Sequence, residues 1–408
     1  MRPLRVAQAD VLGALTLLAP GPVPIAQSLG TVLAAPVSAP HNVPPFTNSA
    51  MDGYAVRAAD LADSSVDLRV IEDVPAGRVA GSPVVPGTAI KVMTGAPLPA
   101  GADAVVRVED TAQHGEMVTI RVRIPAGTAV REAGGDVPAG AEVFGAGTRL
   151  TPVHVGVLAN LGVAEALARR APWVALASTG DELVAVDGPP LGPGQIRDSN
   201  RPMLEALLME FGAHVIDLGR IPDQEEPLRA ALDRGAEEAD AIVTSGGVSM
   251  GEYDLVKGVL TEMGNVAFWQ VAMQPAKPFA FGRVGQKPFF GLPGNPVSAL
   301  VAFEQFVRPG LLRMMGADRL FRPRIEGRSR AKLDTDPEKT VFVRVRTWME
   351  GAVRWCEPSG GQSSNVLSAV AAGDAFAVVE AGTARIEAGE AVMLEMFRWP
   401  EERTFDER

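Results

Sequence analysis

Three polar segments in the chain each follow directly on a short apolar run. They read STGDE at residues 178–182, TSGGVSMGEYD at residues 244–254 and PGNPVS at residues 293–298, after the runs WVALA, ADAIV and FFGL. Gly-Gly turns and helix starts of this kind present backbone N–H groups that hold anions, often phosphates. None of the three has the G-x-x-x-x-G-K-[ST] spacing of a P-loop or the G-x-G-x-x-G spacing of a dinucleotide fold. A different phosphate chemistry must therefore be considered.

Acidic side chains lie on loops of the same kind. Glu182 and Asp254 end the first two segments, and Asp223 follows the apolar run HVIDLGRI. Because Mg²⁺ is held by one or two carboxylates together with phosphate oxygens, these three residues are the predicted metal ligands. The segments also predict ligand contacts from Ser178, Thr179, Gly180, Ser245, Gly246, Gly247, Ser249 and Asn295. Each loop alone is more often a plain turn or helix cap, and only their meeting at one sheet edge favours a site.

These loops fall in a region, residues 169–318, where strand and helix patterns alternate. The runs WVALA, HVIDL, AIVTS and FFGL predict strands, and RPMLEALLMEF, EPLRAALDRGAEEA and PVSALVAFEQFV predict amphipathic helices. Near-continuous apolar strands of this type predict a three-layer α/β domain whose mostly parallel sheet is covered on both faces. Asn200 and Asn295 are the predicted helix caps, because a proline follows each of them early in its helix.

The regions on either side of residues 169–318 have different sequence patterns. Residues 43–142 carry short β-like runs between Gly, Pro and Asp, which predicts a β-rich domain. Residues 1–42 begin with a predicted helix on which Val6, Ala9 and Leu12 share a face, and a helical pattern returns in TPVHVGVLANLGVAEALA at residues 151–168. We expect residues 1–42 and 143–168 to form an elongated N-terminal linking domain into which the β-rich domain is inserted. Residues 319–408 predict a small C-terminal β-barrel, with a sandwich as the alternative.

Composition narrows the function classes. The net charge of −11 argues against a nucleic-acid surface, since phosphate neutralisation needs clustered Lys and Arg. Cys356 is the single cysteine, so no intramolecular disulfide and no cysteine-based zinc site can form, and we expect it to be a packing residue. The N-terminal segment lacks the uninterrupted apolar run of a signal peptide, and no stretch has the length of a membrane span. We therefore expect a cytoplasmic protein.

Longer motifs resemble one known family. The segments SAMDGYAV, MTGAPLPAGADAVV, TSGGVSMGEYD, PAKPFAFG, GLPGNPVSAL and GGQSSNVLSA are similar to those of the molybdopterin molybdenumtransferases, the MoeA family related to the E domain of gephyrin. The resemblance covers roughly residues 2–400. It implies an elongated homodimer with an active site shared between subunits. It also implies Mg²⁺-dependent insertion of molybdate into adenylylated molybdopterin, with release of AMP, and contacts with other molybdenum-cofactor enzymes. No nucleic-acid or membrane partner is implied.

The resemblance also implies roles for single residues. The residues that match family positions facing the site from the β-rich domain are Asp52, Thr94 and Asp136, and those that match its acidic residues on the α/β domain are Glu182, Asp223 and Asp254. Pro293 and Pro296 match prolines that shape the pocket. Lys277, Ser298, Arg344 and Ser364 match a proposed molybdate pocket, and two cations with two hydroxyls suit a compact dianion.

The chain departs from the family pattern at a few positions. Gln270 and Gln274 stand where lysines are common, Val345 replaces a glycine, and Asp374 replaces an asparagine. Three other functions compete with molybdenum transfer: molybdopterin adenylyltransferase activity, a non-catalytic scaffold of the gephyrin type, and a nucleotide hydrolase built on the same α/β domain. The long N-terminal half argues against the adenylyltransferase, and the retained acids argue against the scaffold. The GGQSS segment argues against the nucleotide hydrolase.

Overall fold

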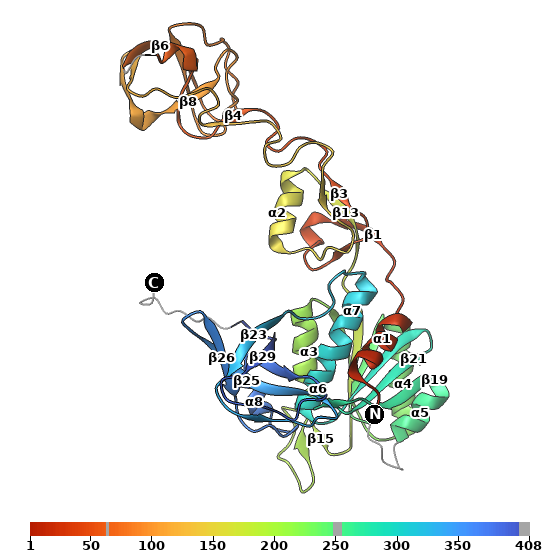
Figure 1. Ribbon diagram of the computed structural model, residues 1–408. Helices are drawn as coiled ribbons and strands as arrows, with labels where there is room; N and C mark the ends of the chain where they lie inside the picture. Colours follow the sequence, from red (N-terminus) through yellow and green to blue (C-terminus); the bar gives the residue numbers. More distant parts are fainter. Residues whose placement is uncertain (63–64, 248–254, 400–408) are drawn as a thin grey trace.

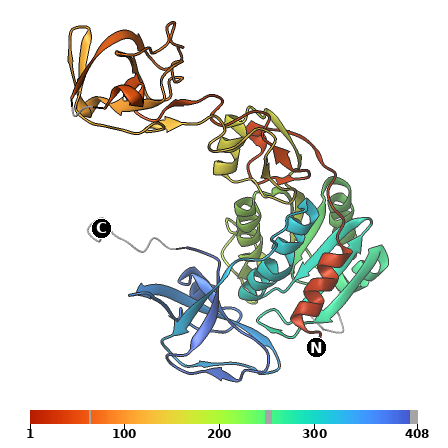
Figure 2. The same cartoon turned by 45° about the horizontal axis from the view of Figure 1, so that its top comes forward.

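The computed structural model describes residues 1–62, 65–247 and 255–399 and shows an elongated molecule (Figure 1). A β-rich unit lies at one end, a small linking unit follows, and an α/β unit and a barrel lie together at the other end. Figure 2 shows the same order from a second direction. Among the described residues, no helix combines the length and the apolarity that a membrane crossing requires.

The α/β unit is built on a six-stranded sheet of order β17-β14-β18-β22-β21-β19. Its strands are β14 (Trp173–Thr179), β17 (His214–Ile221), β18 (Ala241–Ser245), β19 (Gly264–Gln270), β21 (Pro278–Val284) and β22 (Lys287–Leu292). The first four in sheet order are parallel, as predicted, and β21 and β19 add an antiparallel edge. The mostly parallel α/β architecture is thus confirmed.

Helices cover both faces of this sheet. They are α1 (Leu4–Ala14), α3 (Asn200–Phe211), α4 (Glu225–Glu238), α5 (Leu255–Met263), α6 (Pro296–Ala302) and α7 (Arg308–Met315). Residues of α1, α3, α6 and α7 share one buried cluster with the sheet, and residues of α4 and α5 share another on the opposite face. Because burial of one large aliphatic side chain stabilises by about 1.5–3 kcal/mol, these clusters hold the three layers together.

The predicted helix PVSALVAFEQFV contains a π-helical segment, Phe303–Val307, between α6 and α7. Pro309 explains part of this irregularity, since it has no N–H to donate to the carbonyl of Gln305, four residues earlier. The Gln305 carbonyl instead accepts a hydrogen bond from Gln8 Nε2 of α1 at 3.2 Å.

The C-terminal unit is a closed five-stranded barrel, in agreement with the predicted barrel. Its strands are β23 (Arg324–Ser329), β25 (Thr340–Glu350), β26 (Val353–Pro358), β27 (Ala375–Val379) and β29 (Ala391–Met396). The barrel closes because β25 pairs with both β26 and β27. Shorter elements beside it are β20 (Met273–Gln274), β24 (Leu333–Asp334), β28 (Arg385–Ile386) and α8 (Leu367–Ala371). Cys356 lies buried in the barrel core, where burial raises the pKa of its thiol to about 11, as suits a packing residue.

The N-terminal half contains the inserted β-rich unit and the linking unit. The β-rich unit has the strand order β8-β5-β7-β6-β10-β9 and a separate β4–β11 pair. Its strands are β4 (Asn48–Ser49), β5 (Gly53–Val56), β6 (Val66–Val74), β7 (Thr88–Val92), β8 (Ala104–Arg107), β9 (Thr111–His114), β10 (Met117–Ile120) and β11 (Val130–Arg131). The linking unit holds β1 (Gly21–Pro24), β2 (Val32–Leu33), β3 (Val37–Ser38), β12 (Glu142–Phe144), β13 (Glu165–Arg169) and α2 (Pro152–Asn160). Since β13 pairs with β1 and β2, the chain leaves and returns through the linking unit, and the β-rich unit is an insertion.

Three local predictions were wrong. The helical pattern at residues 151–168 ends at Asn160, and residues 165–169 form β13 because tertiary pairing outweighs local pattern. Helix α1 forms, but it buries Leu4, Ala7 and Val11 rather than the face of Val6 and Ala9. Asn200 lies inside α3, whose N-cap is Ser199.

Candidate functional site

The ends of β14, β18 and β22 meet at one edge of the sheet. Ser178 is paired in register with Ser245, and Ser245 is paired with Leu292. The structure therefore brings together the three polar segments that follow these strands, as far as Gly247 in the second one. Ser249 and Asp254 lie outside the described residues.

The Gly-Gly turn after β18 requires glycine for steric reasons. Gly246 has a φ of +99°, and a Cβ there would lie 2.5 Å from the Thr179 carbonyl oxygen. Its N–H donates to the carbonyl of Leu292 at 3.0 Å. The turn after β18 is thus pressed between the neighbouring strand ends, and Gly247, at a φ of +66°, continues it in the same left-handed region.

Asn200 connects two of these loops. Its Nδ2 donates to Ser245 Oγ and to the Gly294 carbonyl, at 2.7 Å each. The side chain therefore fixes the loop after β18 to the loop after β22, although the sequence predicted a cap here. Its own Oδ1, together with Thr179 Oγ1 and Thr244 Oγ1, is buried and has no hydrogen-bond partner among the described residues. Buried polar atoms are rarely left unpaired, so these oxygens favour a polar ligand at this edge.

Ser178 has a different role from that of a free ligand contact. Its hydroxyl donates to Asp198 Oδ2 at 2.5 Å, and Asp198 is buried. Asp198 also accepts from the backbone N–H of Arg201 at 3.2 Å and from its Nε at 3.3 Å. Asp198 thus ties the end of β14 to the first turn of α3.

Acidic groups gather beside the first loop. The backbone N–H of Asp223 donates to Asp181 Oδ1 at 3.1 Å. Partial desolvation, and then the negative charges of Asp181 and Glu182, raise the pKa of the Asp223 carboxyl. Among residues 1–62, 65–247 and 255–399, no three His, Cys, Asp or Glu side chains have a geometry that could hold a metal ion. The described part therefore supplies repelling carboxylates, which a cation would stabilise, but not a complete protein cage.

A second part of the site lies where the barrel meets the start of α6. Val297 N–H donates to the Ser364 carbonyl at 3.1 Å, and Asn295 Nδ2 donates to Ser364 Oγ at 3.0 Å. Pro296 occupies the first turn of α6, and Ser298 follows as a buried residue. Because Gly294 and Asn295 are consecutive, this part adjoins the loop that Asn200 holds.

Arg344 enters this part of the site from β25. It is 2% exposed, and its Nη2 donates to the carbonyls of Gly361 and Ser363 at 3.2 Å each. Its Nε has no hydrogen-bond partner, and no carboxylate forms an ion pair with it, within the described residues. Burial lowers the pKa of Arg344 to about 10, so the guanidinium is still protonated at neutral pH. A buried cation without a counter-charge is costly and is expected to pair with an anion.

Lys277 lies on the turn between β20 and β21. Lys277 is exposed, and its carbonyl accepts from the Val271 N–H at 2.8 Å. In the same segment, the Ala272 carbonyl accepts from the Thr340 N–H of the barrel at 3.0 Å. The hydrogen bond from Lys339 is the main cause that lowers the pKa of Asp336, and the charge of Lys277 is a weaker cause. Lys277 therefore lies toward the barrel residues before β25.

The remaining candidates are Asp52 and Thr94 in the β-rich unit and Asp136 on the segment that leads from this unit back to β12 of the linking unit. Asp52 Oδ1 accepts hydrogen bonds from the backbone N–H of Thr94 at 2.7 Å and from its hydroxyl at 2.8 Å. These bonds lower the pKa of Asp52, with the backbone bond the larger cause. Asp136 is exposed on the turn after β11 and donates its N–H to the Val43 carbonyl at 3.0 Å.

These two groups of candidates are far apart within one chain. Asp52 and Thr94 flank β5 and β7 in the β-rich unit, whereas the strand ends of the α/β unit lie beyond the linking unit. Figures 1 and 2 both show the linking unit between them. A single chain therefore does not bring Asp52 or Asp136 to Arg344.

Comparisons with known proteins agree with this architecture along its length. The model of the MoeA N-terminal region (domain I and II) matches residues 2–162, a probable molybdopterin binding domain matches residues 175–313, and the MoeA C-terminal region (domain IV) matches residues 326–397. The chain is 39% identical to molybdopterin molybdenumtransferase of Haemophilus influenzae, over 91% of this chain and 92% of that protein. The chain belongs to the MoeA family of molybdopterin molybdenumtransferases.

Further MoeA relatives support the same assignment. Molybdopterin molybdenumtransferase 2 of Mycobacterium tuberculosis is 43% identical over 85% of this chain and 87% of its own length. A crystal structure of the molybdopterin biosynthesis MoeA protein from Pyrococcus horikoshii OT3 has a TM-score of 0.82 at 27% identity, covering 97% of this chain and 100% of that chain. The resemblance inferred from the motifs is confirmed.

Sequence reasoning missed one prominent residue of this MoeA chain. Gln362 Oε1 accepts from the backbone N–H of Arg344 at 3.0 Å, and Gln362 Nε2 donates to its carbonyl at 3.1 Å. The amide thus holds the backbone of Arg344 from both sides. The GGQSS motif that carried the resemblance contains Gln362, but nothing in its spacing indicated a partner on another strand.

Proposed function

We propose that this protein inserts molybdate into adenylylated molybdopterin and releases AMP together with molybdenum cofactor. The names of the relatives that match most of the chain support molybdenum transfer. They do not favour an adenylyltransferase, a nucleotide hydrolase or a non-catalytic scaffold. The observation that carries the proposal is the buried, uncompensated guanidinium of Arg344 beside Ser364 and the start of α6.

In this proposal the two parts of the site bind the two substrates. The glycine turn at Gly246 and Gly247, with the oxygens of Thr179 and Asn200, contacts the nucleotide end of the pterin substrate. Arg344, Ser298 and Ser364 bind molybdate, whose charge and size suit one guanidinium and two hydroxyls. The bond from Asn200 to Gly294, next to Asn295, keeps the two substrates adjacent.

Mg²⁺ is the cofactor that we infer for this reaction. When bound, it would neutralise charge on the phosphate oxygens of the substrate. Glu182 and Asp223 fit that role, because Mg²⁺ uses one or two carboxylates plus phosphate oxygens. Burial, and then the charges of Asp181 and Glu182, raise the pKa of Asp223, and a bound cation would favour its charged form. Asp254 is inferred as a further ligand from the family motif alone.

The proposed active enzyme is a homodimer whose site combines two chains. The support is the separation, within one chain, of the β-rich unit, where Asp52 and Thr94 flank β5 and β7, from the strand ends of the α/β unit. In a symmetric dimer, the β-rich unit of one subunit can complete the α/β site of its partner, and the same contact then occurs twice. We also infer a cytoplasmic location, which a single unpaired cysteine suits, and hand-over of the product to other molybdenum-cofactor enzymes.

A single-turnover assay tests the proposed function. The full chain is incubated with adenylylated molybdopterin, Mg²⁺ and varied molybdate, and AMP release is measured. We expect AMP release to depend on molybdate, and Arg344→Gln to raise the molybdate concentration needed by about 10²-fold, by analogy with loss of a charged partner worth 2–3 kcal/mol. Binding of the pterin nucleotide should stay nearly unchanged in this variant. AMP release that ignores molybdate, or equal loss of both affinities, would contradict the proposal.

A further inference from the structure

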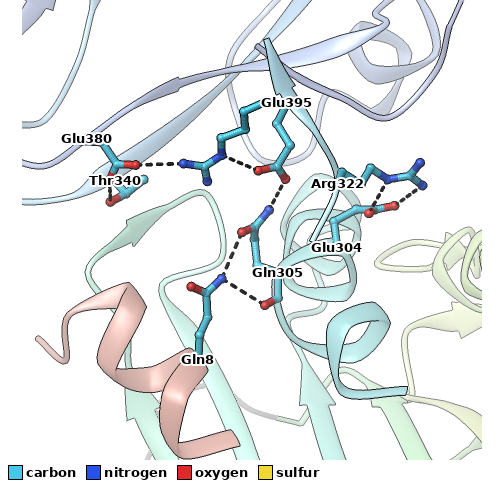
Figure 3. Close-up of polar contacts among 8 residues, drawn as sticks. Gln8, Glu304, Gln305, Arg322, Thr340, Glu380 and Glu395 are labelled. Atoms are coloured by element: carbon cyan, nitrogen blue, oxygen red, sulfur yellow. Dashed lines mark hydrogen bonds and ion pairs between the residues drawn. The ribbon is translucent and has the colours of Figure 1, made fainter. Parts of the chain in front are cut away.

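A chain of polar contacts crosses the junction between α1, the π-helical segment and the barrel (Figure 3). Gln8 Nε2 of α1 donates to Gln305 Oε1 at 3.2 Å, and Gln305 Nε2 donates to Glu395 Oε1 of β29. Glu395 Oε2 then accepts from Arg324 Nε of β23 at 2.9 Å. The chain ends at Glu380, which accepts from Arg324 Nη1 at 3.0 Å and from Thr340 Oγ1 at 3.2 Å.

Its central members are buried and fully paired. Gln305 is 1% exposed and Glu395 is 3% exposed, and both oxygens of the Glu395 carboxylate have a donor. Such groups are tolerated in a core only while every partner is in place, since a donor that is lost leaves a buried carboxylate oxygen unsatisfied. A shift of the barrel on the α/β unit that breaks one of these bonds would therefore leave a buried polar group unpaired.

Other contacts across this junction include directional ones, since Arg322 pairs with the buried Glu304 and the Thr340 N–H donates to the Ala272 carbonyl at 3.0 Å. The remaining contacts are apolar. Phe342 and Phe376 of the barrel share a buried cluster with Phe303 and Phe306 of the π-helical segment. Apolar contacts of this kind are non-directional and tolerate sliding or rotation of one surface on the other. Hydrogen bonds between buried polar groups supply the direction that they lack.

Each side of the junction also carries a residue of the anion pocket. Ser298 lies on α6, seven residues before Gln305, which is about two helical turns along one continuous helix. Arg344 lies on β25, four residues after Thr340, and so on the same face of that strand. The network and the pocket are thus two bridges between the same helix and the same barrel.

We propose that Gln305 and Glu395 are positioning residues for the anion pocket. Their hydrogen bond, together with the pairing of β20 with β25 and the Glu304–Arg322 pair, fixes how the barrel is rotated on the α/β unit and so sets the place of Arg344 relative to Ser298. The π-helical segment contributes to this positioning. Because Pro309 has no N–H to donate to the Gln305 carbonyl, that carbonyl is free to accept the second bond from Gln8 at 3.2 Å. This inference rests on the proposed use of the pocket for molybdate.

The test compares three variants of the full chain. Gln305→Leu removes the amide and keeps most of the volume, and Gln8→Leu removes only the outer bonds. Leu232→Ala, in the buried cluster on the opposite face of the sheet, is the control for lost stability without a change at the junction. For each variant, the Tm, the KM for molybdate and the KM for adenylylated molybdopterin are measured from AMP release, and molybdate binding is measured by calorimetry.

We expect Gln305→Leu to raise the KM for molybdate by about ten- to a hundredfold, as misplacement of a binding group by an ångström can do. The KM for the pterin nucleotide should stay at its wild-type value, and Gln8→Leu should show a smaller rise for molybdate alone. Leu232→Ala should lower the Tm and change neither KM. Should Gln305→Leu fail to fold, Gln8→Leu decides by the same comparison.

An unchanged KM for molybdate in folded Gln305→Leu, or an equal rise in both KM values, would show that the network only supports the fold. Failure of the proposed function looks different, because the wild-type protein itself would then release no AMP with molybdate. In that event, the calorimetric affinity of molybdate for the wild type and for Gln305→Leu still decides the positioning claim: equal affinities overturn it.

Discussion

Two charged side chains at the candidate site are held by neutral partners rather than by opposite charges. Arg344 donates to the carbonyls of Gly361 and Ser363, and Asp52 accepts from the N–H and hydroxyl of Thr94. Within the described residues, neither forms an ion pair. Neutral partners fix the position of a charge without cancelling it. Each charge therefore remains available to a ligand of opposite sign or to the groups around it.

Thr94→Val tests how the Asp52 carboxylate is held. The backbone N–H remains in this variant and the hydroxyl is lost, so the pKa of Asp52 should rise but stay below its unfolded value. Because the folded pKa is lowered, Asp52 contributes stability above its unfolded pKa of about 3.9, and this contribution is lost as the pH falls through the folded pKa. In the variant, the folded pKa of Asp52 should lie closer to its unfolded pKa, so the pH range over which this stability is lost should become narrower. NMR titration of the Asp52 carboxyl carbon measures it, and an unchanged pKa would show that the hydroxyl bond has no electrostatic effect.

At the scale of elements, the strand-end loops depend on close backbone approach. Gly246 has no room for a Cβ, because the Thr179 carbonyl oxygen would lie 2.5 Å away, and its φ of +99° disfavours other residues. Gly246→Ala should therefore destabilise the fold by about 1–3 kcal/mol and weaken AMP binding. Gly258→Ala is the matched control, since nothing lies within 4 Å of its Cβ position in α5, and alanine is favoured over glycine in helices by about 1 kcal/mol. Urea unfolding and AMP calorimetry measure both variants, and wild-type values for Gly246→Ala would rule out this steric argument.

The elements also show what the sequence could and could not reveal. Apolar runs alternating with amphipathic helices predicted the four parallel strands, because burial on both faces leaves that signature in the sequence itself. The strand at residues 165–169 was missed since its partners, β1 and β2, are more than a hundred residues earlier in the chain. Because these strands were predicted, Thr179 and Gly246 could also be predicted to lie at their carboxyl ends. The bonds from Asn200 to Ser245 and from Gln362 to Arg344 depend on tertiary packing that local spacing does not record.

At the scale of the whole molecule, the elongated shape separates the candidate residues into two groups. Asp52 lies in the β-rich unit, Asp136 lies between that unit and the linking unit, and Arg344 lies on β25 of the barrel, beyond the linking unit. A compact one-chain enzyme would have no need for that separation. The two-fold dimer that we propose would explain it, because the β-rich unit of one chain would then meet the α/β unit of the other.

A hybrid dimer tests the central claim most directly: that molybdate-dependent AMP release occurs at a site built from both chains. Subunits carrying Asp52→Asn and Arg344→Gln are co-expressed with different tags, and the mixed dimer is purified and assayed at a molybdate concentration that just saturates the wild type. In the two-chain site, one of its two sites has both residues intact, so the mixed dimer should show about half the wild-type activity, while each variant alone is nearly inactive. As a control, a dimer of wild-type and doubly substituted subunits should be nearly inactive. The reverse result, an inactive mixed dimer and a half-active control, would contradict the account.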